Sequence, residues 1–74
     1  MNQDFIRDRI KEQMHKAGIK QSTLAHSLGI SQSSVSDILN GNTRLSLDML
    51  SMIATAIGVN EWELLPPPPE YTGK

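Results

Sequence analysis

The side chains with the clearest capacity for chemistry lie close together after Ser31, and the chemistry they offer is hydrogen bonding. On a helix of about 100° per residue that begins at Gln32, the polar residues fall within an arc of about 140°. These residues are Gln32, Ser33, Ser36, Asp37 and Asn40. The opposite arc is mostly apolar and holds Val35, Ile38 and Leu39. Such a helix can pack on one side and still present amide, hydroxyl and carboxylate groups to a groove.

Catalytic and metal-binding patterns are missing from the sequence. The chain has no cysteine, which excludes disulfides and thiolate ligands. It has no nucleophile elbow, phosphate loop, zinc spacing or acid pair. His15 and His26 have no clustered partner, which favours solvated or half-buried histidines over metal ligands. We therefore expect no enzymatic activity, no catalytic residue, no metal and no cofactor.

Helical periodicity predicts five segments that would position the polar residues. Their expected bounds are Gln3 to Ala17, Gln21 to Leu28, Gln32 to about Leu39, Leu47 to Ile57, and one or two turns from Glu61 to Leu65. No stretch alternates as a strand would. The predicted fold class is all-α, with five helices in one compact domain.

Several residues are expected to cap these helices. Ser31 and Ser46 stand where N-caps are needed, and Asn2 or Asp4 would cap the first helix. Asn60 followed three residues later by Glu63 resembles a capping box.

The segments 21–28 and 32–39 have the spacing of two short helices that cross steeply over a tight turn. Ala25 is the small residue that a close crossing demands, and Gly29 supplies the positive φ of the turn. The side chains expected to point into the core are Leu24, Leu28, Ile30, Val35 and Ile38. The segment 47–57 is the most apolar, so we expect it to be the central and most buried helix.

Length and composition predict one small domain with a tail. We expect an ordered domain over residues 1–65, and a tail over 66–74 that is extended at its prolines and then flexible. No apolar run reaches membrane-spanning length, and the first residues lack the pattern of a secretory signal. The expectation is a soluble cytoplasmic protein without membrane association.

The charge of the chain is unevenly distributed. Net charge is −1. Residues 1–20 carry an excess of Lys and Arg over Asp and Glu, whereas residues 48–74 carry an excess of Asp and Glu. We expect the acidic end to face away from any polyanion.

From about Ile6 to Leu65 the chain resembles the Cro/C1-type helix-turn-helix family of phage repressors and small bacterial regulators (the XRE family). The matching motifs are Gln21-x-x-Leu24-Ala25, Leu28-Gly29-Ile30-Ser31-Gln32, Val35-Ser36, Asn40-Gly41 and Ile53-Ala54-x-Ala56-Ile57-Gly58-Val59. The resemblance implies a lambda repressor-like fold whose third helix enters the major groove of double-stranded DNA. It implies a small transcriptional regulator, either a repressor or an autoregulator.

The resemblance also implies roles for individual residues. The base-reading positions would be Gln32, Ser33, Ser36 and Asp37. The positions that contact the DNA backbone would be Lys20, Gln21, Ser31, Asn40, Asn42, Thr43 and Arg44. In the family the residue at the position of Gln21 often braces the first residue of the recognition helix, here Gln32. A glutamine amide can bond adenine at N6 and N7 together.

The chain departs from the commoner pattern of the family in its charges. Its third helix has no Lys or Arg, and Asp37 places a carboxylate on the presumed DNA side. Leu39 stands where a glutamate is frequent. We therefore expect modest affinity with a shallow salt dependence. The cationic contacts would come first from Lys20 and Arg44, and then from Lys16, Arg9 and Arg7.

A single recognition helix reads only a few base pairs, so we expect a weak homodimer on a palindromic operator. Its interface would be formed by Met49, Met52, Ala56, Trp62 and Leu65, together with the neighbouring Leu64. Trp62 belongs either to the core or to such an interface. Two alternatives stay open: a protein-binding or antitoxin-like module, and a DNA-targeting subunit of a larger assembly.

Overall fold

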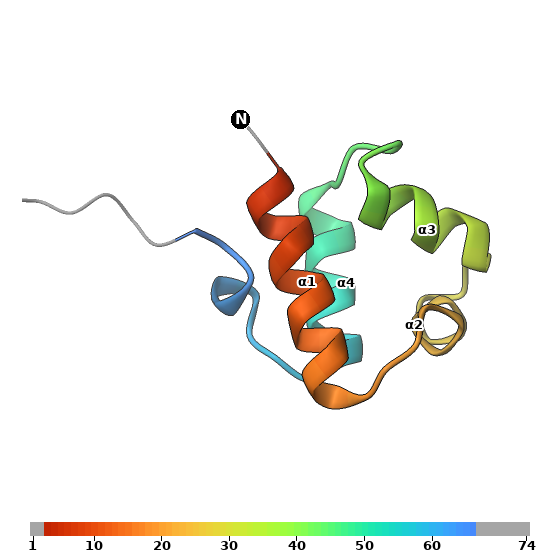
Figure 1. The fold of residues 1–74 in the computed structure, drawn as a ribbon, viewed down its shortest axis with the longest axis horizontal. Coiled ribbons are helices and arrows are strands. Elements are labelled where there is room, and N and C mark those ends of the chain that lie inside the picture. The colour runs from red at the N-terminus through yellow and green to blue at the C-terminus, as the bar shows by residue number, and fades with distance from the viewer. Residues whose placement is uncertain (1–2, 67–74) are drawn as a thin grey trace, which may run out of the picture.

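The computed structural model describes residues 3–66, and within them every regular element is helical (Figure 1). Its elements are α1 (Asp4–Ala17), α2 (Gln21–Leu28), α3 (Gln32–Asn40), α4 (Leu47–Ile57) and the 3-10 helix η1 (Glu61–Glu63). The predicted all-α class is confirmed. The predicted tail lies outside the described residues except for Pro66, which is exposed. No helix in the described range is long and apolar enough to cross a membrane.

The start of α1 differs from the prediction. Gln3 occupies the N-cap position and Asp4 is already the first helical residue, so the predicted cap at Asp4 is wrong. The side chain of Gln3 does not cap the helix because its amide is bonded elsewhere. Its Nε2 donates to the Leu45 carbonyl at 2.8 Å, and its Oε1 accepts from the Leu45 N–H at 3.0 Å. The predicted cap at Asn2 lies outside the described residues.

The two predicted serine caps are confirmed. The Ser31 hydroxyl accepts from the Ser34 N–H at 3.1 Å, and the Ser46 hydroxyl accepts from the Met49 N–H at 3.1 Å. Each hydroxyl pairs one of the amides that a helix start leaves without an intrahelical partner.

The fifth predicted helix is a single 3-10 turn and not an α-helix. The Glu63 carboxylate accepts from the Asn60 N–H at 2.8 Å, as the predicted capping box requires. The turn cannot continue because Leu65 precedes Pro66, and a residue before proline is disfavoured in the α region.

The core is formed by side chains from all four α-helices, and it contains most of the predicted residues. Leu24, Leu28, Val35 and Ile38 are buried, whereas Ile30 is only half-buried against the core. Two leucines outside the α-helices complete the core. Leu45 in the α3–α4 loop is 5% exposed and Leu64 after η1 is 0% exposed. Leu64 is therefore a core residue and not the interface residue that the sequence predicts.

α4 is buried on one side and open on the other. Its residues Leu50, Ile53, Ala54 and Ile57 lie in the core, but Leu47 and Met52 are 77% and 45% exposed. α4 packs against α1, α2 and η1, and these neighbours leave part of its surface open.

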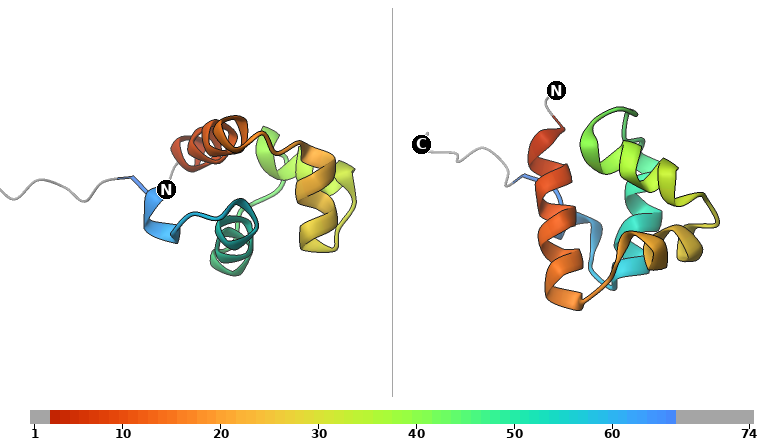
Figure 2. Two further views of the ribbon diagram at one scale, coloured as in Figure 1. Left: turned by 90° about the horizontal axis from the view of Figure 1, so that it is seen from below. Right: turned by 45° about the vertical axis from the view of Figure 1, so that its right-hand side comes forward.

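α2 and α3 lie together at one end of the domain, and η1 lies at the other end (Figure 2, left). α1 and α4 lie between the two ends, so α3 is far from η1 (Figures 1 and 2).

Candidate nucleic-acid interface

α2 and α3 pack against each other across the short turn at Gly29. Gly29 has a φ of +71°, the left-handed conformation that the turn needs. The Ile30 N–H then donates to the Ala25 carbonyl at 3.1 Å, which closes the C-terminus of α2 just before the Ser31 cap of α3. Ala25 is 4% exposed. The predicted placement of a small buried residue on α2 is confirmed.

α3 exposes three polar side chains that have no partner within the described part of the domain. Gln32, Ser33 and Asp37 are exposed, and their side chains form no hydrogen bond or ion pair with any residue in the range 3–66. Their donors and acceptors are directed to solvent, where a ligand can pair with them.

Two further polar residues on this side of α3 are bonded to each other. The Asn40 amide Nδ2 donates to the Ser36 hydroxyl at 3.1 Å, and Ser36 is half-buried. The hydroxyl of Ser36 keeps its own donor, and the carbonyl oxygen of Asn40 keeps its acceptor capacity. Both residues stay accessible to a ligand, but their side chains are oriented by this bond.

Lys20 and Gln21 lie at the start of α2, which packs against α3. Lys20 is exposed and Gln21 is half-buried. The brace that the family resemblance implies between Gln21 and Gln32 is absent, since among the described residues no hydrogen bond joins them. The Ser31 hydroxyl is already bonded to the Ser34 N–H and to the Ser34 hydroxyl, at 3.1 Å and 3.0 Å.

The loop after α3 exposes the other predicted backbone-contacting residues, Asn42, Thr43 and Arg44. The loop is folded back on the helix that precedes it. The N–H groups of Asn42 and Thr43 both donate to the Asp37 carbonyl, at 2.9 Å and 3.3 Å. Bonds of this kind satisfy carbonyls that a helix C-terminus otherwise leaves unpaired.

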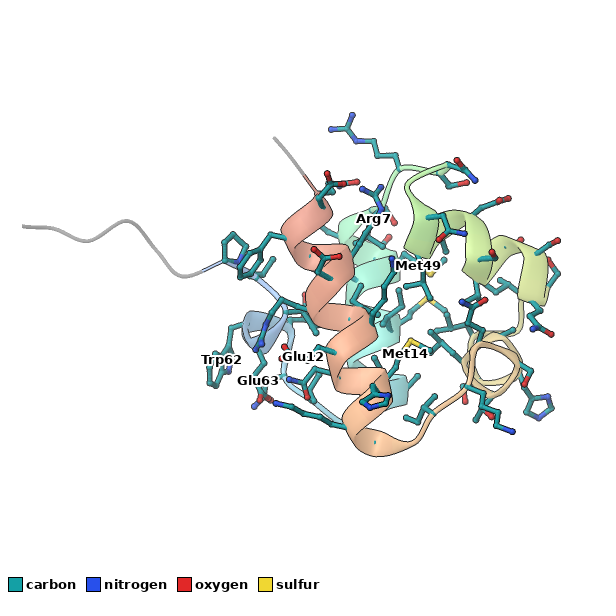
Figure 3. All side chains as sticks on the ribbon, in the orientation of Figure 1. Arg7, Glu12, Met14, Met49, Trp62 and Glu63 are labelled. Carbon is teal, nitrogen blue, oxygen red and sulfur yellow. The ribbon has the colours of Figure 1, made fainter. Side chains whose placement is uncertain are left out.

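The expectation that Arg7 contacts phosphate is wrong, because its guanidinium is buried. Arg7 is 9% exposed and extends from α1 toward the end of α3 (Figure 3). Its Nε donates to the Ile38 carbonyl at 2.8 Å, and its Nη2 donates to the Thr43 carbonyl at 3.1 Å. An ion pair with Asp4 at 3.7 Å adds to these contacts.

Arg9 is also held within the domain. Its Nε and Nη2 donate to the Glu63 carbonyl at 3.3 Å and 3.0 Å, and its Nη1 pairs with Glu12. These contacts direct the guanidinium to η1, at the end of the domain away from α3 (Figure 1). Of the five cations that the sequence predicts for contacts to DNA, the exposed ones are therefore Lys16, Lys20 and Arg44.

Lys11 is an exposed cation beside the candidate interface that was not predicted from the sequence. It is exposed and lines two shallow grooves, one shared with Asn40 and the other with Gln21. It therefore lies between the end of α3 and the start of α2. A helical projection contains the signal, since Lys11 is four residues after Arg7 and falls on the same side of α1.

The five residues predicted for a dimer interface differ in accessibility. Met49 and Ala56 are half-buried against the core, whereas Met52, Trp62 and Leu65 are 45%, 71% and 36% exposed. Met52 and Ala56 line a groove with residues of α2. Trp62 projects from η1 on the side of α1 away from α3 (Figure 3), so it is not a core residue.

The carboxylates of η1 agree with the predicted charge distribution. Glu61 and Glu63 lie on η1, at the opposite end from α3 (Figure 1). No group of three or more potential metal-binding side chains occurs between residues 3 and 66.

Comparison with known proteins identifies one family. The model of a helix-turn-helix family matches residues 10–63, which include α2, α3 and α4 entirely. No curated protein and no solved structure matches the chain.

Proposed function

Because the chain belongs to the Cro/C1-type helix-turn-helix family, a family of DNA-binding proteins, we propose that it binds double-stranded DNA sequence-specifically as a transcriptional repressor or autoregulator. The observation that carries the proposal is the exposed polar start of α3. Gln32 and Ser33 are exposed and their side chains form no hydrogen bond within residues 3–66, and the two residues begin the helix that enters the major groove in this family.

Each polar side chain of α3 has a base edge that fits its chemistry. The Gln32 amide pairs with adenine N6 and N7, and the Asp37 carboxylate accepts from cytosine N4. Ser33 and Ser36 can bond to either kind of base edge. The bond from Asn40 to Ser36 leaves the Ser36 hydroxyl hydrogen free to donate.

Contacts to the DNA backbone come from residues around α3. Lys20 and Gln21 serve at the start of α2, and Asn40, Asn42, Thr43 and Arg44 serve at the end of α3 and in its loop. Ser31 acts mainly as the cap of α3, which leaves other amides of that helix end available for phosphate. Lys11 adds a cation between these two groups.

We place two copies of the protein on a palindromic operator. Exposed Trp62 and Leu65 supply apolar area for a two-fold interface at η1, and Met52, Met49 and Ala56 offer a second apolar area on α4, where Met52 and Ala56 line a groove with α2. Burying a large apolar side chain such as Trp62 stabilises association by about 2 kcal/mol.

A protein-binding or antitoxin-like role is the second candidate. It is favoured by Trp62, which is 71% exposed, and by the absence of Lys and Arg from α3. Retention on heparin or on nonspecific DNA at low salt separates the two, because a pure protein-binding module is not retained.

Selection of bound sequences from a random duplex library tests the proposed function. We expect the selected duplexes to share two inverted half-sites about one helical turn apart. Enrichment of a single half-site would support DNA binding without the dimer. A pool with no enriched sequence would contradict specific recognition.

A further inference from the structure

We propose that Arg7 is a positioning residue for the DNA interface: from the buried side of the domain it fixes the end of α3 and the loop 41–45, which presents Arg44 to phosphate. The inference rests on the proposed function, which names the loop as a backbone-contacting segment. It assigns a role in binding to a residue that cannot itself touch DNA, since the side chain of Arg7 is 10% exposed.

The first support is the way in which Arg7 spans two parts of the interface. Its Nε reaches the Ile38 carbonyl in the last turn of α3, and its Nη2 reaches the Thr43 carbonyl in the loop. The planar guanidinium joins these two carbonyls through one rigid group. A Cβ on Gly41 would lie 3.8 Å from the guanidinium carbon, so the loop packs directly over the arginine.

The second support is Gln3, which orients Arg7 and extends its hold to the end of the loop. Its Oε1 accepts from Arg7 Nη2 at 3.0 Å and from the Leu45 N–H at 3.0 Å. Its Nε2 donates to the Leu45 carbonyl at 2.8 Å. Both backbone groups of Leu45 are thereby paired with the side chain of Gln3, the N-cap residue of α1.

The third support is that the hydrogen bonds that hold this loop from outside α3 come from Arg7 and Gln3. The remaining backbone hydrogen bonds of residues 41–43 go back to the carbonyls of Asp37 and Ile38, within α3 itself. Arg44 is exposed between Thr43 and Leu45, whose backbones are bonded to Arg7 and Gln3. Release of Arg7 would therefore loosen the segment that carries Arg44.

Arg7→Met tests the proposal, and Arg9→Met is its matched control. Both substitutions remove one positive charge and hydrogen bonds from α1 to backbone carbonyls, but those of Arg9 end on η1. DNA affinity is measured at a temperature where both variants are fully folded. We expect Arg7→Met to lose about tenfold or more, because re-ordering even one backbone residue on binding costs that much. We expect Arg9→Met to stay within about twofold of the wild-type protein, since surface changes away from the site matter little. Equal losses in the two variants would overturn the proposal.

A double-mutant cycle with Arg44→Ala separates positioning from an independent effect. If Arg7 acts through the loop, Arg44→Ala weakens binding strongly in the wild-type background and only slightly in the Arg7→Met background. If the two losses multiply as independent effects, Arg7 does not position Arg44 and the proposal is contradicted.

Amide hydrogen exchange of the free protein gives a readout that does not depend on DNA. We expect faster exchange at Asn42, Thr43 and Leu45 in Arg7→Met, and unchanged exchange there in Arg9→Met. If the wild-type protein bound no duplex, the proposed function would fail, and unchanged exchange in Arg7→Met would then remove the positioning role as well.

If Arg7→Met does not fold, Gln3→Ala takes its place, because it removes the support of Arg7 and both bonds to Leu45. The same faster exchange and weaker binding are expected, and their absence would overturn the proposal.

Discussion

Gln32 is the residue on which the proposed base readout depends most. It is exposed at the first position of α3 and has no partner within the described chain. Gln32→Ala should lose about 1–3 kcal/mol of discrimination at one base pair, because a bidentate amide–adenine contact is removed. Competition between duplexes that differ at single positions measures this loss. An unchanged base preference would remove Gln32 from the reading set.

Arg44 should behave differently, because a phosphate contact carries no sequence information. We expect Arg44→Ala to weaken binding to all duplexes alike and to lower the slope of log K against log salt by about 1. Titrations at several salt concentrations with two unrelated duplexes give both quantities. A loss confined to one duplex would show instead that Arg44 reads a base.

The contrast between Arg7 and Arg44 marks where residue-scale prediction from sequence fails. Arg44 is exposed and stays a candidate for a phosphate contact, whereas Arg7, which the sequence also predicts for such a contact, is buried. The partners of Arg7 are the main-chain carbonyls of Ile38 and Thr43, more than 30 residues away in the chain. Backbone carbonyls leave no mark in the pattern of side chains, so this contact could not be predicted.

At the scale of the elements, the two serine caps offer a matched pair of substitutions. Ser31→Ala and Ser46→Ala should each lower the free energy of unfolding by about 0.5–2 kcal/mol, because each leaves a helix-start amide unpaired. Thermal unfolding followed by circular dichroism measures both. Only Ser31→Ala should also weaken DNA binding, since Ser31 caps α3 and Ser46 caps α4. Equal effects of the two caps on DNA binding would argue against α3 as the recognition helix.

Helix bounds and caps were predictable because their signals are local. Ser31, Ser46 and the turn glycine Gly29 specify their structure through neighbours a few residues away. Leu45 and Leu64 were missed because each lies outside an α-helix, where no periodicity marks a buried side. The exposure of Leu47 on α4 could not be predicted, because a count of apolar residues does not tell how many neighbours a helix has.

At the scale of the whole molecule, the proposed recognition helix and η1 lie at opposite ends of the domain. Polar α3 lies at one end, and η1 with its carboxylates and Trp62 lies at the other (Figures 1 and 3). We expect a weak homodimer that a palindromic operator tightens, because two half-sites bind two copies at once.

Sedimentation over a wide concentration range, with and without operator, measures this association. Trp62→Ala should weaken it, whereas Leu47→Ala removes an equally exposed apolar side chain outside the proposed interface and should leave it unchanged. A strict monomer that binds DNA one-to-one would contradict the dimer and favour a subunit of a larger assembly.

The most direct test of the central claim is the affinity of the wild-type protein for a selected duplex and for an unrelated duplex of equal length at the same salt concentration. We predict that the affinity for the selected duplex is higher by a factor on the order of 10³ or more, because base contacts from α3 add to the shared backbone contacts. Equal affinity for the two duplexes, or no binding to either at low salt, would contradict sequence-specific recognition of DNA by this protein.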